Sequence, residues 1–284
     1  MPIQSILVGL IGAGIQASRA PRLHEQEGDE QVLRYLYRLI DLDVLRLSVE
    51  ALPELLTAAE RLGFTGLNIT FPCKQAVIEH LHELDRDARA TGAVNTVLFR
   101  GGRRLGYNTD WSGFAESFRR TLADAGRDRV VQFGAGGAGA AVSHALLTLG
   151  VGRIAIVDID RKRAGDLAEA LCARFGTGRA VASEDVAEAV STADGIVNTT
   201  PVGMAKFPGT ALAGGLLSSK LWVADVIYFP METQLLREAK ARGCRTMSGA
   251  GMAVFQAADA FRLFSGTEPD VERMLQHFAE MTDD

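Results

Sequence analysis

The chain has 284 residues, more than one typical domain, and its 47% hydrophobic and 23% charged content is that of a globular protein rather than a disordered or membrane-embedded one. A formal net charge of −5 provides no broad positive field, which argues against nucleic acid as a partner. The three cysteines lack C-x-x-C or Cys/His spacing, so we expect no metal site, no disulfide framework and a cytoplasmic location. The apolar run at the N-terminus is too short to cross a bilayer, so we expect no membrane span.

The first part of the chain alternates short apolar runs with helical patterns. Strands are predicted at residues 6–11, 34–40, 66–70 and 94–99, and helices at residues 49–62 and 74–84. Such alternation favours a mostly parallel sheet with helices on both faces. The glycines of GLIGAG at 9–14 imitate a dinucleotide-binding fingerprint, but no helix with apolar periodicity follows, so we interpret this stretch as a strand-to-loop turn.

A second series of strands and helices follows residue 108. A helix is predicted over 112–125, with Ser112 as its N-cap and Gly126 at its end. Further strands are expected at 130–133, 153–157, near 181, at 195–198, 222–225 and 245–247, with a helix over 137–149. Two amphipathic helices, at 252–264 and 271–281, have no strand between them and are expected to pack back on the first domain.

We therefore predict an α/β protein of two domains. The N-terminal domain, over residues 1–107 with the helices of 251–284, is a mostly parallel α/β domain. The C-terminal domain, over 108–250, is a doubly wound Rossmann domain.

The stretch VVQFGAGGAG at 130–139 places G-x-G-G-x-G directly after a strand and before a helix. Glycines there permit a tight turn, let the backbone approach a pyrophosphate and let helix and strand pack closely. The next strand ends at Asp158, about twenty residues on, where such sites have an acidic residue for the ribose. The pattern predicts a dinucleotide site formed by Gly134, Ala135, Gly136, Gly137, Ala138, Gly139 and Asp158.

The acidic residue also indicates which dinucleotide is bound. Asp158 can accept hydrogen bonds from both hydroxyls of the adenosine ribose but repels a 2′-phosphate, so NAD is the expected cofactor. Arg161 and Arg163 lie in the same loop and could pair with that phosphate, which leaves NADP possible. Alternatively, both arginines only solvate the start of the following helix.

Polar clusters interrupt the apolar pattern where strands end: NITFPCK at 68–74, GAVNT at 92–96 and GYNTD at 106–110. In α/β sheets such strand ends carry ligand sites. In residues and order these clusters resemble the shikimate dehydrogenase family, and the likeness continues through NTTPVGM at 198–204, DVIY at 225–228 and GAGM at 249–252. It covers nearly the whole chain. Asp158, Pro201, YFP at 228–230 and EPD at 268–270 are most similar to the NAD-dependent quinate/shikimate branch.

The resemblance implies an enzyme, an NAD(P)-dependent oxidoreductase that reversibly oxidises shikimate to 3-dehydroshikimate, quinate to 3-dehydroquinate, or both. It makes the N-terminal domain the substrate-binding and catalytic domain and the C-terminal domain the NAD(P)-binding domain. It assigns Lys74 and Asp110 as the catalytic pair. Implied substrate contacts are Ser18, Thr70, Asn95, Tyr228 and Gln256. The remaining implied cofactor contacts are Arg163, Thr200, Val202, Val226 and Gly249.

The chemistry of these residue types agrees with that implication. Oxidation of a secondary alcohol needs a base for the hydroxyl proton, and a lysine amine that partial burial keeps neutral can serve. Asp110 would orient the amine of Lys74 and bind a substrate hydroxyl, although a plain ion pair is the alternative reading. Thr70, Asn95, Asn108 and Gln256 supply neutral donors and acceptors that suit a polyhydroxylated ring with one carboxylate.

One motif departs from the family. Where the family usually has two hydroxyl residues in S-x-S-P, this chain has Ser18 but then Ala20. A hydrogen bond to a charged group contributes about 1.5 to 3 kcal/mol, so its loss weakens carboxylate binding or shifts preference among related acids. Arg19 is a candidate replacement donor. The choice between shikimate, quinate and a related acid stays open.

Two other functions remain possible from the sequence. One is a dehydrogenase for a related hydroxy or amino cyclohexene acid, and the other is a nucleotide-sensing protein that lost catalysis, because a fold alone does not prove chemistry. The histidines and Cys73 form no competing centre, since Cys73 has no paired histidine and is interpreted as a packing residue. The expected partner is a small-molecule substrate, and the chain is a monomer or a homodimer.

Overall fold

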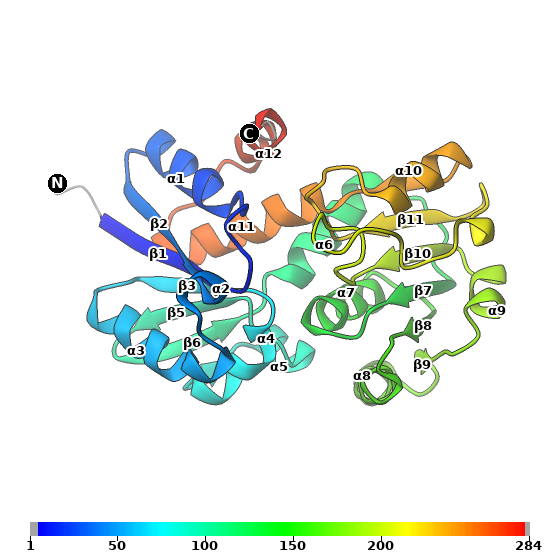
Figure 1. Ribbon diagram of the computed structural model, residues 1–284, viewed down its shortest axis with the longest axis horizontal. Coiled ribbons are helices and arrows are strands. Elements are labelled where there is room, and N and C mark those ends of the chain that lie inside the picture. Colours follow the sequence, from blue (N-terminus) through cyan, green and yellow to red (C-terminus); the bar gives the residue numbers. More distant parts are fainter. Residues whose placement is uncertain (1–4, 282–284) are drawn as a thin grey trace. The chain divides into compact units, whose positions relative to one another are not determined.

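The computed structural model describes residues 5–281, which belong to two compact units (Figure 1). One unit combines Met1–Thr109 with Val254–Asp284, and the other is Asp110–Ala253. The boundaries from the sequence, after residues 107 and 250, differ from these by two and three residues. The first four and last three residues of the predicted N-terminal domain lie outside the described residues.

The first unit contains a six-stranded sheet in the order β2-β1-β3-β5-β6-β4. Its strands are β1 (Ser5–Gly12), β2 (Arg34–Asp41), β3 (Gly66–Ile69), β4 (Glu83–Leu84), β5 (Thr96–Arg100) and β6 (Arg103–Tyr107). β1 is parallel to β2 and β3, and β4 is parallel to β6, whereas β5 is antiparallel to both of its neighbours. The carboxyl ends of β1, β2, β3 and β6 therefore lie at one edge of the sheet, together with the start of β5.

Helices cover both faces of this sheet. They are α1 (Ala20–Glu30), α2 (Leu42–Leu45), α3 (Leu52–Arg61), α4 (Cys73–Ala76), α5 (Arg86–Thr91), most of α11 (Gly249–Ser265), α12 (Val271–Glu280) and the 3₁₀ turns Val49–Ala51 and Val77–His80. Alternate residues of β1 point to opposite faces: Ile11 packs in a cluster with Leu56 of α3, and Val8 packs in another with Phe261 of α11. The two ends of the chain thus build one core.

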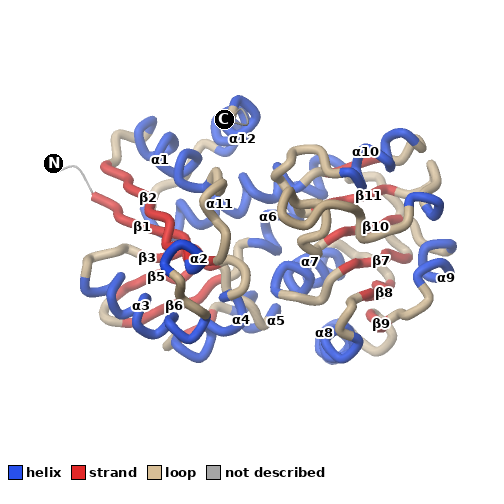
Figure 2. The backbone as a smooth tube through the Cα atoms, in the orientation of Figure 1, coloured by secondary structure: helices blue, strands red, loops and turns tan. Residues whose placement is uncertain are grey.

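A buried ion pair fastens the last helix to the first one. Glu27 of α1 is fully buried, and one of its carboxylate oxygens lies 2.8 Å from the guanidinium of Arg273 on α12. The same carboxylate accepts a hydrogen bond from the backbone N–H of Asp270 at 2.9 Å. α1 and α12 lie side by side in Figure 2. Because loss of one partner would leave a buried charge uncompensated, this pair holds α12 in place.

Three local predictions are wrong, two in the first unit and one at the start of the second. The helix predicted over 74–84 is instead α4, the 3₁₀ turn and β4, because Glu83 and Leu84 pair with β6. Helix α1 was not predicted after the Gly9–Gly14 stretch, because its buried residues include polar His24 and Glu27 and show no apolar period. Helix α6 begins at Asp110, so Ser112 lies in its first turn and is not its N-cap.

The second unit contains a fully parallel six-stranded sheet in the order β12-β11-β10-β7-β8-β9. Its strands are β7 (Arg129–Phe133), β8 (Arg153–Val157), β9 (Ala180–Ala182), β10 (Gly195–Asn198), β11 (Trp222–Asp225) and β12 (Arg245–Met247). Its helices are α6 (Asp110–Thr121), α7 (Gly137–Thr148), α8 (Arg161–Phe175), α9 (Val186–Ser191), α10 (Gln234–Ala241) and the 3₁₀ turn Gly214–Leu216. This strand order is that of the doubly wound Rossmann fold, so the predicted fold class is confirmed.

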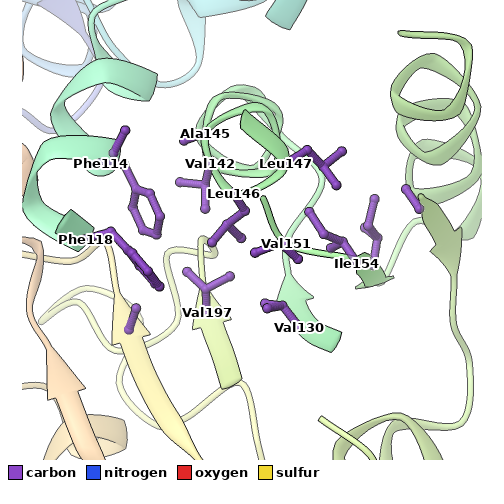
Figure 3. Close-up of a cluster of buried hydrophobic side chains, with 14 of the residues drawn as sticks. Phe114, Phe118, Val130, Val142, Ala145, Leu146, Leu147, Val151, Ile154 and Val197 are labelled. Carbon is purple, nitrogen blue, oxygen red and sulfur yellow. The ribbon is translucent and has the colours of Figure 1, made fainter. Parts of the chain in front are cut away.

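Apolar side chains cover both faces of the second sheet. Figure 3 shows Phe114 and Phe118 of α6 with Leu146 of α7 over Val130 and Val197, all buried. On the opposite face, a second cluster contains the neighbouring residues Val131 and Ile196 together with apolar residues of α10. None of the helices within residues 5–281 has the length together with the apolar composition that a bilayer crossing needs.

Candidate functional site

The glycine-rich turn of the second unit lies between β7 and α7, as the motif predicts. Gly134 has a φ of +99°, and a Cβ there would lie 2.7 Å from the hydroxyl oxygen of Thr199. A Cβ at Gly139 would lie 2.3 Å from the carbonyl oxygen of Gly134, so α7 approaches β7 more closely than any side chain allows. Gly136 is the N-cap of α7, and the N–H groups of Gly137 and Ala138 begin the helix. A dinucleotide pyrophosphate fits such a helix start.

Asp158, directly after β8, reaches back to this turn. One oxygen of its carboxylate accepts from the N–H of Ala135 at 2.7 Å, and the other accepts from the N–H of Asp160 at 2.8 Å. The guanidinium of Arg163 lies 3.7 Å from the Asp158 carboxylate and is about half exposed. Arg161 pairs instead with Glu184 at 2.9 Å. Of the two arginines, Arg163 is thus the one beside the acidic residue.

A hydrogen-bonded pair of side chains connects the loops after β10 and β11. The Nδ2 group of Asn198 donates to Asp225 at 3.1 Å and to the carbonyl of Val202 at 3.0 Å, while its Oδ1 accepts from the N–H and hydroxyl of Thr200. Asp225 also accepts from the N–H of Ile227 at 3.1 Å. The structure therefore collects Thr200 and Val202 at one sheet edge. Asn198 and Asp225 were not predicted as site residues, although both end strands in the family motifs.

Two further predicted cofactor residues lie at the same edge. Val226 directly follows β11, and the N–H of Gly249, at the start of α11, donates to the carbonyl of Ile227 at 3.2 Å. The hydroxyl of Thr199 donates to the carbonyl oxygens of Phe133 and Gly134 at 2.7 and 3.0 Å, which ties this edge to the glycine turn. The twelve residues predicted to contact a cofactor are all in the second unit.

In the first unit, Asn95 and Gln256 are brought together although 161 residues separate them. The Nδ2 group of Asn95 donates to Gln256 Oε1 at 3.0 Å and to the hydroxyl oxygen of Thr109 at 2.9 Å. The N–H of Thr109 donates back to Asn95 Oδ1 at 2.8 Å. Both amide hydrogens of Asn95 are thus engaged within the protein. A substrate that accepted from Asn95 would take the place of Gln256 as acceptor.

Three residues outside the predicted site extend this network into the sheet. The Tyr37 hydroxyl donates to Asn68 Oδ1 at 2.8 Å, and Asn68 Nδ2 donates to the hydroxyl oxygen of Thr96 at 3.0 Å. That hydroxyl donates in turn to Asn95 Oδ1 at 3.1 Å. The direction of each bond fixes the next amide, so the NH₂ group of Asn95 turns toward Gln256. Asn68 and Thr96 carried a sequence signal, since Asn68 opens the NITFPCK cluster and Thr96 ends the GAVNT cluster, whereas Tyr37 lies outside these clusters.

Thr70 and Lys74 follow the end of β3. The N–H of Thr70 donates to the carbonyl of Ile11 at 2.9 Å, and the carbonyl of Lys74, a half-buried residue of α4, accepts from the N–H of Val94 at 2.8 Å. Both bonds anchor this loop to segments of the same unit.

Asp110, the buried first residue of α6, and Tyr228 belong to the second unit. Asn108, another residue of the polar clusters, uses its amide to hold the carbonyl of Ala93 at 2.9 Å.

The loop before α1 carries Ser18, whose hydroxyl oxygen accepts from the N–H of Ala20 at 3.3 Å. A hydroxyl that accepts in this way still has its own proton to donate. Arg19 is nearly buried, with its guanidinium carbon 5.4 Å from the centre of the Phe278 ring on α12. The Arg19 side chain therefore packs against α12, and this contact does not support Arg19 as the replacement for the hydrogen-bond donor missing at Ala20.

The remaining reactive side chains form no rival centre. Burial raises the pKa of the Cys73 thiol to about 11, so it is not a ready nucleophile. Burial also lowers the pKa of His24 to about 3, and its ring nitrogen shares a hydrogen bond of 3.1 Å with the Tyr35 hydroxyl. Within the described part of the chain, no three His, Cys, Asp or Glu side chains are grouped so that they could hold a metal ion.

Two family models match the chain. "Shikimate dehydrogenase substrate binding domain" matches residues 10–97, and "Shikimate 5'-dehydrogenase C-terminal domain" matches residues 249–277. A shikimate dehydrogenase (NADP(+)) from Streptomyces avermitilis is 58% identical over 99% of this chain and 97% of its own length. A quinate/shikimate dehydrogenase (NAD(+)) from Corynebacterium efficiens is 49% identical over 98% of this chain and 99% of its own length.

A solved structure is similar over the whole chain. It is quinate dehydrogenase from Corynebacterium glutamicum in complex with NAD, with a TM-score of 0.91 and 47% identity, and the match covers 98% of this chain and 100% of that one. The similarity therefore extends to both units and their connections.

Burial raises the pKa of Asp225 to about 6, against the effect of its hydrogen bonds from Thr233, Ile227 and Asn198. Since the unfolded chain has the lower pKa, the folded protein takes up this proton first, and stability rises as the pH falls from about 6 toward about 4. At about 1.4 kcal/mol per unit of pKa, the gain amounts to roughly 3 kcal/mol. We predict that Asp225→Asn removes this pH-dependent part of the free energy of unfolding.

Urea unfolding between about pH 8 and pH 4 measures the effect. Asp185→Asn, at the exposed N-cap of α9, is the control that should retain the wild-type profile. Parallel profiles for wild type and Asp225→Asn would contradict the prediction.

Proposed function

Since this chain belongs to the shikimate dehydrogenase family, we propose that it is an NAD(P)-dependent oxidoreductase that interconverts shikimate and 3-dehydroshikimate, quinate and 3-dehydroquinate, or both. The family resemblance drawn from the motifs is confirmed, and so is the class of enzyme. One observation carries the choice of substrate chemistry. Ser18, Thr70 and Lys74 come after strands that end at one edge of the first sheet, and Asn95 directly precedes β5, which starts at that edge. Hydroxyl, amide and amine groups gathered there suit a small polyhydroxylated acid.

The reaction moves a hydride and a proton from one secondary alcohol. The residues of the glycine turn would hold a nicotinamide coenzyme, which would supply the hydride acceptor. Lys74 would take the hydroxyl proton as the C–O bond becomes a carbonyl, and in reduction it would return that proton. Asp110 would orient the amine and bind a neighbouring substrate hydroxyl. Ser18 would donate to the substrate carboxylate, while Thr70, Tyr228 and Gln256 would bind its hydroxyl groups.

The geometry of the second unit supports a dinucleotide on the twelve residues predicted for it. The pyrophosphate would lie at the start of α7, where Gly134 and Gly139 leave no room for side chains. Asp158 would accept from the ribose hydroxyls, which favours NAD, while Arg163 beside it is the group available to a 2′-phosphate. The relatives carry names with either cofactor, and the proposal assigns the choice between NAD and NADP to this loop.

Cell location and assembly are also part of the proposal. Three unpaired cysteines suit a reducing cytoplasm, and the negative formal charge gives no reason to expect a nucleic-acid partner. A small-molecule substrate is then the main partner of a monomer or homodimer.

The direct test is the formation of NADH, followed by absorbance, when the purified protein is mixed with NAD and either shikimate or quinate. Activity with at least one of these acids supports the proposal. No activity with either acid and either cofactor, from protein that binds NAD, would contradict it.

Lys74→Met removes the amine while keeping most of the bulk. Because a general acid or base contributes roughly a hundred- to ten-thousand-fold, we predict a loss of kcat of that size with a smaller change in the Kd for NAD. Steady-state rates at saturating substrate measure the loss of kcat, a titration with NAD measures the Kd, and Lys220→Met, an exposed lysine, is the control. Near-wild-type kcat in Lys74→Met would leave Lys74 as a binding residue only.

Asp158→Ser tests the cofactor preference. The wild type should have a higher kcat/KM with NAD than with NADP, and removing the carboxylate should narrow the ratio by about tenfold, which corresponds to 1.4 kcal/mol. Asp160→Ser is a matched control, since Asp160 lies two residues further along and caps α8. A wild type that prefers NADP would indicate that Arg163 determines the preference.

Ala20→Ser restores the hydroxyl that the family usually has. Because a hydrogen bond to a carboxylate contributes about 1.5 to 3 kcal/mol, the KM for the preferred acid should fall by about tenfold or more. Ala17→Ser, exposed in the same loop, should leave the KM unchanged. If Ala20→Ser alters the KM for neither acid, the carboxylate is bound by other groups.

A further inference from the structure

Asp41, the last residue of β2, has a carboxylate that receives four hydrogen bonds. Oδ1 accepts from the N–H of Gly14 at 2.9 Å and of Asp43 at 3.1 Å. Oδ2 accepts from the N–H of Ile15 at 3.0 Å and from the side-chain amide of Gln16 at 2.9 Å. Asp41 is only 3% exposed, so these donors replace water around the charge. Three of the four come from one loop, residues 14–16, which follows β1.

This loop leads directly to Ser18. The carbonyl of Ile15, whose N–H is bound to Asp41, accepts from the N–H of Ser18 at 2.9 Å. The hydroxyl oxygen of Ser18 then accepts from the N–H of Ala20, the first residue of α1. Two hydrogen bonds, joined through the backbone of Ile15, therefore link the Asp41 carboxylate to Ser18, whose hydroxyl is proposed to bind the substrate carboxylate.

The chemistry of the position requires a carboxylate. Two oxygens can accept four hydrogen bonds, whereas an asparagine has one acceptor oxygen and would turn an NH₂ group toward backbone N–H groups. Burial alone would raise the pKa of Asp41, but the bonds from Gln16, Gly14, Asp43 and Ile15 outweigh it and lower that pKa, so the group is ionised at neutral pH.

We infer that Asp41 is a positioning residue for substrate recognition: it fixes the loop 14–18 so that the Ser18 hydroxyl is aimed at the carboxylate of the substrate. The inference rests on the proposed function and adds a residue to it. Asp41 itself touches neither substrate nor cofactor in this role. Its loss should raise the KM for the acid much more than it lowers kcat, and should leave the KM for the cofactor unchanged.

Asp41→Asn is the main variant. We expect its KM for shikimate or quinate to rise by about tenfold or more, with kcat and the KM for NAD within about twofold of wild type. Because Asp41 acts through Ser18, adding Ser18→Ala to Asp41→Asn should raise the KM far less than Ser18→Ala does alone. The methyl ester of the same acid, which lacks the charge, should lose little from Asp41→Asn. Asp270→Asn, the exposed N-cap of α12, is the control.

Two further measurements keep the inference open to refutation. Gln16→Ala removes one of the four donors from an exposed position and should give a smaller rise of KM in the same direction, even if Asp41→Asn folds poorly. Hydrogen exchange should accelerate in residues 13–18 of Asp41→Asn while other segments stay at wild-type rates. An unchanged KM, additive effects with Ser18→Ala, or unchanged exchange would overturn the role of Asp41. A wild type inactive toward both acids would instead overturn the proposed function, and the exchange experiment would still test the anchoring of the loop.

Discussion

The site depends on one constraint: strands that run in the same direction end at a common edge of their sheet. In the first unit, β1, β2, β3 and β6 share a direction, so the loops that carry Ser18, Thr70 and Lys74 emerge side by side. In the second unit all six strands are parallel, and the loops after β7, β10 and β11 meet at the reversal of strand order. Strand direction thus gathers motifs that are scattered along nearly the whole sequence.

A second rule concerns the residue at which a strand ends. Asp41, Asn198 and Asp225 each end a strand, and each is buried. The side-chain oxygens of Asn198 and Asp225 accept from groups of the loop that follows their own strand, whereas those of Asp41 accept mainly from the loop that follows the neighbouring strand β1. A loop at a strand end has backbone N–H groups without strand partners, and these side chains bond them. The same bonds fix the loop, which lets neighbouring residues face a ligand with little freedom to lose on binding. The residues that fix the loops are therefore distinct from the residues proposed to bind ligands, but adjacent to them.

Elements that depend on consecutive residues could be predicted from the sequence, whereas elements and contacts that depend on residues far apart in the chain could not. The glycine turn could be predicted because strand, turn and helix are consecutive within residues 129–148. Helix α1 could not, because it buries polar His24 and Glu27, and β4 could not, because it depends on pairing with β6. The contact between Asn95 and Gln256, and the direction of the Arg19 side chain onto α12, involve segments far apart in sequence, so no local pattern reports them.

The composite origin of the first unit has a consequence for synthesis. The second unit is continuous, so all of its residues are synthesised before Arg273, whereas Glu27 is synthesised 246 residues before the arginine with which it pairs. Domains generally fold as units while the chain emerges, and here the interrupted unit cannot be completed until its last helix is released. By the assignments proposed above, the residues of the coenzyme site are all synthesised before the last helix of the unit that binds the substrate. A chain truncated before α12 would therefore form only the coenzyme site.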